Sequence, residues 1–401
     1  MQAAAPARDT LAPADSLRVF LVTFGPGELV WERFGHNAIW IHDPAAGTDL
    51  AYNWGMFSFD QQGFLARLLR GTMLYWMAPF PIDAMINAYA AADRSVWVQE
   101  LAIVPARRSE LQAALADNAR PENAYYRYDY YRDNCSTRVR DALDRVVDGR
   151  IRAALAGAPS GTTYRSHTRR LLQDMPAMYT GIQLVLSPRA DREIDRWEEA
   201  FLPVRLMQAL REVRVPDGAG GERPLVIGER EAFRAVGPAE PETVPNRLPW
   251  FLAAGVGFAV VLGLLVDPAG RGRAWARVPL VLLTAGWSLA AGMAGLVLVG
   301  AWMFTDHVFW YPNENLLQTN PFALALAALA LPLLVRRAPS AAAVRVGVGI
   351  AALSLLGLAL KALPGFDQMS WEILAFTVPV NVGVAAALIR LRRSGEATAR
   401  A

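Results

Sequence analysis

From Leu248 almost to its end, the 401-residue chain contains five long apolar runs. The runs cover residues 249–266, 279–304, 321–335, 344–363 and 371–389. A helix that crosses a bilayer needs about 20 mainly apolar residues, and only the third run is clearly shorter than that. The sequence therefore predicts an α-helical transmembrane bundle over residues 248–393, followed by a short tail at 394–401.

The arginines between these runs predict how the bundle is oriented. They follow the first, third and fifth runs, as Arg271, Arg273, Arg277, Arg336, Arg337, Arg345, Arg390, Arg392, Arg393 and Arg400. The other two loops, 305–320 and 364–370, contain neither arginine nor lysine. Because positively charged loops stay in the cytoplasm, we expect the N-terminal half and the 305–320 loop outside and the C-terminus inside.

The first half has the mixed composition of a water-soluble domain. An irregular alternation of strand and helix patterns over residues 17–215 predicts an α+β domain. Residues 1–16 are expected to be disordered. Residues 216–247 are expected to form a linker, with room for a short hairpin around Leu225 to Ile227. We expect a signal peptide to be missing from this sequence, because no apolar leader precedes residue 17. The whole chain has a net charge of +3, and its first half contains no basic tract. These features give no indication of a nucleic-acid partner.

Cys135 is the only cysteine of the chain and is our candidate nucleophile. Helix-capping residue types surround it from Asp133 to Thr137, and residues 138–147 have the spacing of an amphipathic helix. The sulfur is therefore expected in the first turn of a helix, where the free N–H groups favour a thiolate and a lowered pKa. Those N–H groups are also suited to hold an oxyanion. The alternative is a small buried apolar residue, which is the usual role of a lone cysteine.

His36 is the candidate base. It follows Gly35 at the start of a predicted strand, and its ordinary pKa suits proton transfer. Asn53 lies in the next predicted strand, where it is placed to orient the imidazole across a hairpin. A hydrogen-bonded structural histidine is the alternative. His42, His167 and His307 show no paired spacing, so no metal site is predicted.

The outer loop 305–320 is the second candidate region. His307, Asn313 and Asn315 are polar residues that we expect to bind a lipid headgroup or substrate at the membrane surface. Trp310 and Tyr311 fit the aromatic belt at a bilayer interface. A plain interfacial loop without a binding role is the alternative.

Three sequence motifs carry a resemblance to a known family. They are Phe34-Gly35-His36-Asn37-Ala38, Tyr52-Asn53-Trp54-Gly55 and Asp133-Asn134-Cys135-Ser136-Thr137. Together they resemble the bacterial family named for the N-terminal periplasmic domain of Lnb, a lipoprotein N-acyltransferase, and the loop motif beginning at Asn313 extends the resemblance toward the C-terminus. The order of histidine and cysteine is also similar to permuted papain-like thiol enzymes of the lecithin:retinol acyltransferase type.

The resemblance implies a permuted papain-like cysteine domain with Cys135 and His36 as its catalytic pair. Asn53 and Asn134 are further catalytic candidates by their positions alone. It also implies an enzyme of the bacterial inner membrane that needs no cofactor. Its acyl donor would be a membrane phospholipid, and its acceptor the N-terminal amine of a lipoprotein. A cell-wall cysteine peptidase or amidase, and a non-catalytic membrane-anchored binding module, are the alternatives.

Overall fold

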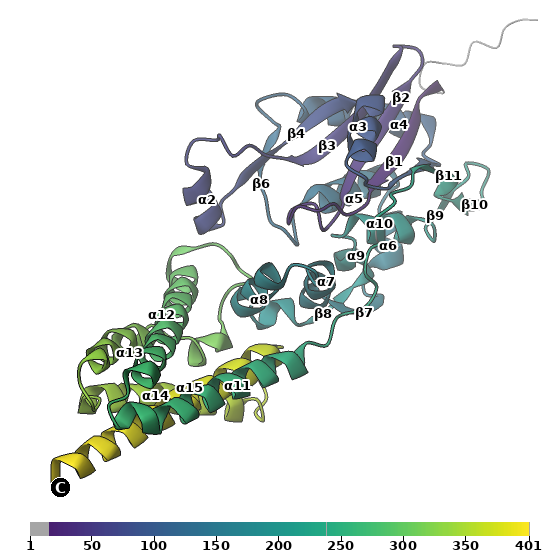
Figure 1. Ribbon diagram of the computed structural model, residues 1–401. Helices are drawn as coiled ribbons and strands as arrows, with labels where there is room; N and C mark the ends of the chain where they lie inside the picture. The colour runs from purple at the N-terminus through teal and green to yellow at the C-terminus, as the bar shows by residue number, and fades with distance from the viewer. Residues whose placement is uncertain (1–15, 238, 401) are drawn as a thin grey trace, which may run out of the picture. The chain divides into compact units, whose positions relative to one another are not determined.

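The computed structural model of the protein describes residues 16–237 and 239–400 (Figure 1). The residues expected to be disordered lie, except for Ser16, outside this range. The chain forms two compact units. Unit 1 comprises Met1–His167 and Glu193–Glu242, and unit 2 comprises Thr168–Arg192 and Thr243–Ala401.

Unit 1 is built on a seven-stranded antiparallel sheet with the order β11-β5-β1-β2-β3-β4-β6. Its strands are β1 (Arg18–Phe24), β2 (His36–Asp43), β3 (Thr48–Met56), β4 (Leu74–Pro81), β5 (Val96–Leu101), β6 (Tyr125–Arg127) and β11 (Val226–Phe233). The hairpin expected between His36 and Met56 is present as β2 and β3, and β2 begins at His36. Unit 1 is therefore the mixed α/β domain that the sequence predicts.

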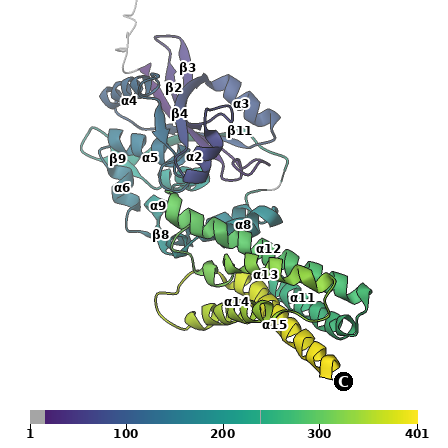
Figure 2. The same ribbon diagram turned by 90° about the vertical axis from the view of Figure 1, so that its left-hand side faces the viewer.

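Helices cover both faces of the sheet, and Figure 2 shows α3 and α4 on opposite sides of the strands. One face packs against α3 (Ile82–Ala91), and the other against α4 (Pro105–Asn118), α5 (Cys135–Val146), α6 (Arg150–Leu155) and α10 (Pro203–Leu210). Side chains alternate along β2, so Ile39 packs with Val139 and Leu143 of α5 while Ala38 joins the core under α3. This alternation places α5 on the face of β2 opposite α3.

Smaller elements complete unit 1. They are α2 (Phe64–Arg70), β7 (Pro159–Thr163), β8 (Glu193–Asp195), α9 (Arg196–Glu199), β9 (Arg214–Pro216), β10 (Glu222–Pro224) and the first half of α7 (Tyr164–Leu171). The segment expected as a linker, 216–247, contains β10 and β11, and β11 pairs with β5 at the edge of the main sheet. Residues 222–233 of this segment therefore form strands, because an edge strand can expose charged side chains such as Glu229 and Arg230 and still donate its backbone to the sheet.

Unit 2 contains five segments that are long and apolar enough to cross a membrane, which supports a multi-pass membrane protein. Its elements are α8 (Pro176–Val185), η1 (Pro188–Ala190), α11 (Leu248–Gly270), α12 (Ala274–Phe304), η2 (Glu314–Leu317), α13 (Phe322–Ala330), η3 (Leu331–Leu334), α14 (Ala341–Leu360) and α15 (Trp371–Arg400). The third segment, which the sequence marks as short, consists of α13 with 3₁₀ turns at both ends. Helix α11 packs closely on α15, where a side chain at Gly255 would collide with the backbone of Phe376.

Residues 168–192 belong to unit 2, although the sequence places them in the soluble domain. Here the hydroxyl of Tyr179 on α8 donates to Glu372 at 2.8 Å, and Arg169 forms an ion pair with the same carboxylate at 2.6 Å. These partners lie about two hundred residues apart in the chain, so no local sequence pattern indicates the contact.

Candidate functional site

Cys135 is the first residue of α5, as predicted. Asn134 is the N-cap, and its Oδ1 accepts hydrogen bonds from the N–H groups of Ser136 and Thr137, each at 2.9 Å. The hydroxyl of Thr137 accepts from the N–H of Asn134 at 2.8 Å, which completes a capping box. The cap sets the direction of the first helical turn and thereby the position of the sulfur.

The contacts of Asn134 are those of a helix cap. Besides its Oδ1 contacts, its Nδ2 donates to the carbonyl oxygens of Tyr130 at 3.1 Å and Phe201 at 3.0 Å. Both ends of the amide are therefore engaged within unit 1. The predicted catalytic role of Asn134 stays a prediction. Its contacts position the start of α5.

A buried amide joins the start of β2 to the start of α5. Asn37 accepts a hydrogen bond from Thr23 at 2.8 Å and donates to the hydroxyl of Ser136 at 3.1 Å. Ser136 in turn donates to the carbonyl of Ala200 at 2.7 Å. Asn37 and Ser136 are fully buried, so this bridge holds the residue after His36 against the residue after Cys135. No local sequence pattern indicates this bridge, although both residues lie next to candidate site residues in the chain.

His36 is oriented by Asn53. The two side chains face each other across the hairpin, with Nε2 of His36 3.0 Å from Oδ1 of Asn53. The amide of Asn53 is held in this orientation because its Nδ2 donates to the carbonyl of Ala51 at 2.9 Å and contacts Sδ of Met85. Nε2 of His36 must therefore carry the proton, which leaves Nδ1 as the basic nitrogen.

Burial lowers the pKa of His36 to about 4, against the opposing effect of its hydrogen bond to Asn53. Burial also raises the pKa of the Cys135 thiol to about 11. Backbone N–H groups of Asn37, Ser136 and Cys135 donate toward the sulfur and oppose that shift, but they do not reverse it. The lowered thiol pKa expected at a helix start is thus wrong for this site, because loss of water around the sulfur outweighs the helix terminus.

Shared neighbours bring His36 and Cys135 into one site. The ring of Tyr89 on α3 stacks on the imidazole with ring centres 6.2 Å apart, and a negative charge on Cys135 contributes to the raised pKa of the Tyr89 hydroxyl. The positive charge of Arg94 acts on both His36 and Cys135. As whole residues, His36 and Cys135 are both partly exposed.

Gly55 and Tyr126 form the side of the site next to α5. Gly55 has a φ of +93°, and a Cβ at this position would lie 3.4 Å from Cβ of Cys135 and 4.0 Å from the hydroxyl of Tyr126. That hydroxyl is buried and has no hydrogen-bond partner among residues 16–237 and 239–400. Nothing in the tyrosine-rich stretch 125–131 of the sequence singles out Tyr126 as a donor beside the sulfur.

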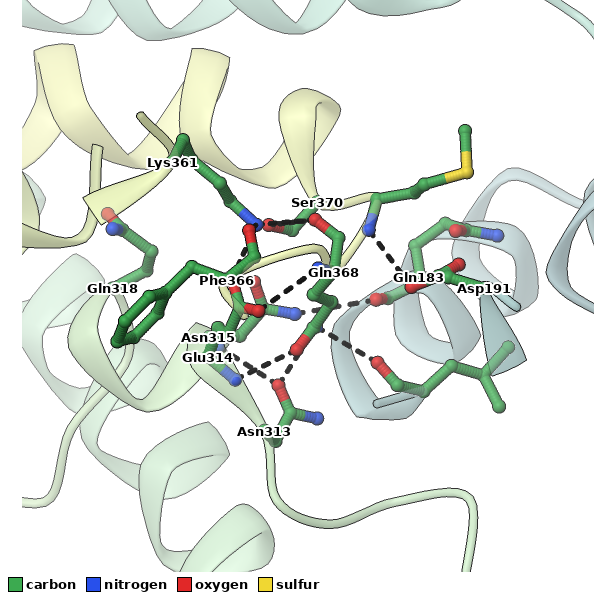
Figure 3. A network of polar contacts seen from close by, with 12 residues as sticks. Gln183, Asp191, Asn313, Glu314, Asn315, Gln318, Lys361, Phe366, Gln368 and Ser370 are labelled. Atoms are coloured by element: carbon green, nitrogen blue, oxygen red, sulfur yellow. Dashed lines mark hydrogen bonds and ion pairs between the residues drawn. The ribbon is translucent and has the colours of Figure 1, made fainter. Parts of the chain in front are cut away.

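Asn313 and Asn315 of the 305–320 loop lie in a polar network within unit 2 (Figure 3). Asn313 donates to the carbonyl of Val185 at 2.8 Å, and Asn315 donates to that of Leu184 at 2.8 Å, so both hold the end of α8. Gln368 joins the network by donating to Oδ1 of Asn313 at 3.0 Å. These amides stabilise the loop through contacts inside the protein, and their predicted role in substrate binding stays a prediction.

Two further contacts fix the same loop. His307 is buried and its ring stacks on Trp310, with centres 4.3 Å apart. Lys361 forms a buried ion pair with Glu314 at 2.5 Å. The substrate-binding role predicted for His307 is likewise untested. Within the described ranges, no group of three or more His, Cys, Asp or Glu side chains is arranged to hold a metal ion.

Residues 6–172 match the family described as Lnb N-terminal periplasmic domain. This range includes His36, Asn53, Asn134 and Cys135. The comparisons with curated proteins and with solved structures give no match.

Proposed function

We propose, from the match of residues 6–172 to the family of the Lnb N-terminal periplasmic domain, that the chain is a membrane-bound, cysteine-dependent acyltransferase. In this proposal a fatty acyl chain moves from a membrane phospholipid to Cys135 and then to the N-terminal amine of a lipoprotein. The five apolar segments of unit 2 support the choice of substrates, because both donor and acceptor reside in a bilayer.

The observation that carries the proposal is the geometry around the sulfur. Cys135 starts a capped helix, backbone N–H groups point toward its sulfur, and a neutral histidine with a fixed tautomer shares its surroundings. A nucleophile, a base held by a third group and preorganised N–H donors are the parts that acyl transfer requires.

In the first half-reaction, Nδ1 of His36 removes the thiol proton as the sulfur attacks an ester carbonyl of the phospholipid. The N–H groups of Asn37 and Cys135 stabilise the oxyanion. The intermediate collapses, the bond from carbonyl carbon to glycerol oxygen breaks, and the leaving oxygen takes the proton from His36. A thioester on Cys135 and a lysophospholipid result.

In the second half-reaction, the amine of the acceptor attacks the thioester carbonyl. His36 accepts the proton from the attacking amine and returns it to the departing sulfur. An amide bond forms, the carbon–sulfur bond breaks, and the enzyme regains its thiol. No net oxidation or reduction takes place, so the proposed reaction needs no redox partner.

The proposal also includes the placement of the chain. The arginine-rich loops of unit 2 favour a cytoplasmic C-terminus and a bacterial inner-membrane location with the site on the periplasmic side. The order of a histidine strand before a cysteine helix supports a permuted papain-like relationship for unit 1.

Intact-mass measurement of the full-length protein tests the proposal. Purified protein in phospholipid nanodiscs should gain one fatty-acyl mass, which hydroxylamine removes and which is absent in Cys135→Ala. His36→Ala should slow this gain, whereas His42→Ala on the same strand should not, because His42 pairs with Asp49 at the surface. A wild-type protein that transfers acyl chains without an acyl-enzyme, or a Cys135→Ala variant that still transfers them, contradicts the proposal.

A further inference from the structure

Unit 1 exposes an apolar surface around α2, which we call the α2 surface. It consists of Trp31, Phe59, Leu65, Leu68 and Leu69, whose exposed fractions range from 37% for Leu68 to 65% for Leu65. Helix α2 has no buried residue, and Figure 1 shows it set apart from the sheet on the connection between β3 and β4. Large exposed apolar clusters on a soluble domain mark interaction sites.

Ring contacts hold this surface together and connect it to the interior. Phe59 contacts Trp31 at 5.7 Å and Phe64 at 5.2 Å, measured between ring centres. Phe57 contacts Phe59 at 5.2 Å and stacks on Tyr75 at 5.1 Å. The exposed rings are therefore part of one continuous aromatic cluster.

The cluster continues toward the site. Tyr75 stacks on Tyr128 with ring centres 4.1 Å apart. Tyr128 is close enough to Cys135 for a charge on the sulfur to raise the pKa of its hydroxyl. An aromatic path of Tyr128, Tyr75, Phe57 and Phe59 thus runs from the neighbourhood of the thiol to the α2 surface.

The charges on α2 indicate the kind of partner. The helix carries Arg67 and Arg70 in its last turn and no acidic residue. Apolar side chains flanked by arginines complement an anionic bilayer surface, where leucines enter the acyl region and arginines contact phosphates. The same chain contains five candidate membrane-spanning segments, so we expect unit 1 to be tethered to a bilayer.

We propose that the α2 surface docks on an anionic phospholipid bilayer and that the aromatic path leads a lipid acyl chain from it toward Cys135. The docking part concerns binding alone, whereas the path rests on the proposed acyltransferase function. Two measurements separate them.

The first measurement uses the full-length protein with spin labels, which the single native cysteine makes straightforward. In a Cys135→Ser background, Leu69→Cys places a label on α2, and Ala45→Cys places the control on the exposed turn between β2 and β3. In nanodiscs of phosphatidylcholine with phosphatidylglycerol, the label at position 69 should become accessible to oxygen and protected from a water-soluble nickel chelate. The label at position 45 should stay aqueous, and the protection at 69 should weaken in phosphatidylcholine alone.

A label at position 69 that stays aqueous in both lipid mixtures overturns the docking. Spin–spin broadening between labels on two copies also overturns it, because the surface would then bind a second chain. Neither result depends on whether Cys135 forms a thioester.

The second measurement compares two acyl donors. The double variant Leu65→Ser, Leu69→Ser should slow acylation of Cys135 from bilayer phospholipid by at least about tenfold, because two leucines no longer enter the bilayer. Its acylation by a short water-soluble thioester should be unchanged. Equal loss with both donors, or no loss with either, overturns the path. Failure of the wild-type protein to be acylated by any donor overturns the proposed function, and the spin labels still decide the docking.

Discussion

Nε2 of His36 lies 3.0 Å from Oδ1 of Asn53, which fixes both the tautomer and the direction of the imidazole. The histidine is held from the adjacent strand β3, while Cys135 comes from α5. The sheet therefore orients the proposed base, and a helix cap positions the proposed nucleophile.

Replacing Asn53 tests this orientation. Asn53→Ala should slow acylation of Cys135 by about tenfold to a hundredfold, because an oriented hydrogen bond to a buried ring is lost. Asn53→Asp should instead raise the pKa of His36 above its value of about 4, since a carboxylate stabilises the imidazolium. Acylation rates across pH measure both effects. Asn118→Ala, which removes the acceptor of Trp54 away from the site, should leave the rate unchanged.

The pH dependence of thiol alkylation tests the electrostatics of the resting site. Burial raises the pKa of Cys135 to about 11, so only a small fraction is thiolate at neutral pH. The rate with iodoacetamide should keep rising as pH increases through 9 and 10, toward an inflection near 11. An exposed thiol from Leu69→Cys in the Cys135→Ser background should instead level off above about pH 8.5. A plateau for Cys135 below pH 8 contradicts a thiol stabilised in its neutral form.

Gly55 is required by both its backbone angle and its neighbour. Gly55→Ala should destabilise unit 1 by about 1–2 kcal/mol, because a side chain at positive φ is strained, and should crowd Cys135. Gly47→Ala at the turn between β2 and β3 supplies the control, since its φ is +63° and no atom lies within 4 Å of its added Cβ. Thermal unfolding should shift for both variants. Maleimide labelling of Cys135 should slow only for Gly55→Ala, and equal labelling of both variants would show that contact with Gly55 does not limit access.

The unpartnered hydroxyl of Tyr126 lies beside Gly55, which also borders Cys135, and in the proposed reaction we expect it to donate to the oxyanion. We expect Tyr126→Phe to fold normally, since a buried hydroxyl without a partner contributes no stability. Acylation of Cys135 should fall by about a hundredfold, the effect of removing one oxyanion donor. Tyr125→Phe alters the exposed neighbour and should have no effect. A normal rate for Tyr126→Phe assigns oxyanion stabilisation to the backbone N–H groups alone.

The sequence predicts those parts of the structure that local residue chemistry determines. Asn134 and Thr137 mark the start of α5 because capping depends on residues three positions apart. His36 marks the start of β2 because Gly35, with a φ of +77°, ends the preceding turn. The apolar runs mark the membrane segments because bilayer thickness sets their length.

Features that depend on partners far apart in the sequence cannot be predicted from local sequence patterns. The pKa of Cys135 follows from how much protein surrounds it, and the helix start alone predicts the opposite direction. The sequence of β11 is as polar as that of a linker, and only its pairing with β5 identifies it as a strand. The bridge from Asn37 to Ser136 joins residues about a hundred positions apart.

Residues 168–192 leave unit 1 and return to it, so the backbone passes between the units at 167/168, 192/193 and 242/243. A cut at residue 247 therefore does not release a self-sufficient soluble protein. Such a cut removes the hydrogen-bond partners of α8. These are Asn313 and Asn315, which donate to carbonyl oxygens at the end of α8, and Glu372, which accepts from the hydroxyl of Tyr179. A water-soluble form for crystallisation calls for excision of this internal loop and a short splice between residues 167 and 193, in addition to removal of everything after residue 242.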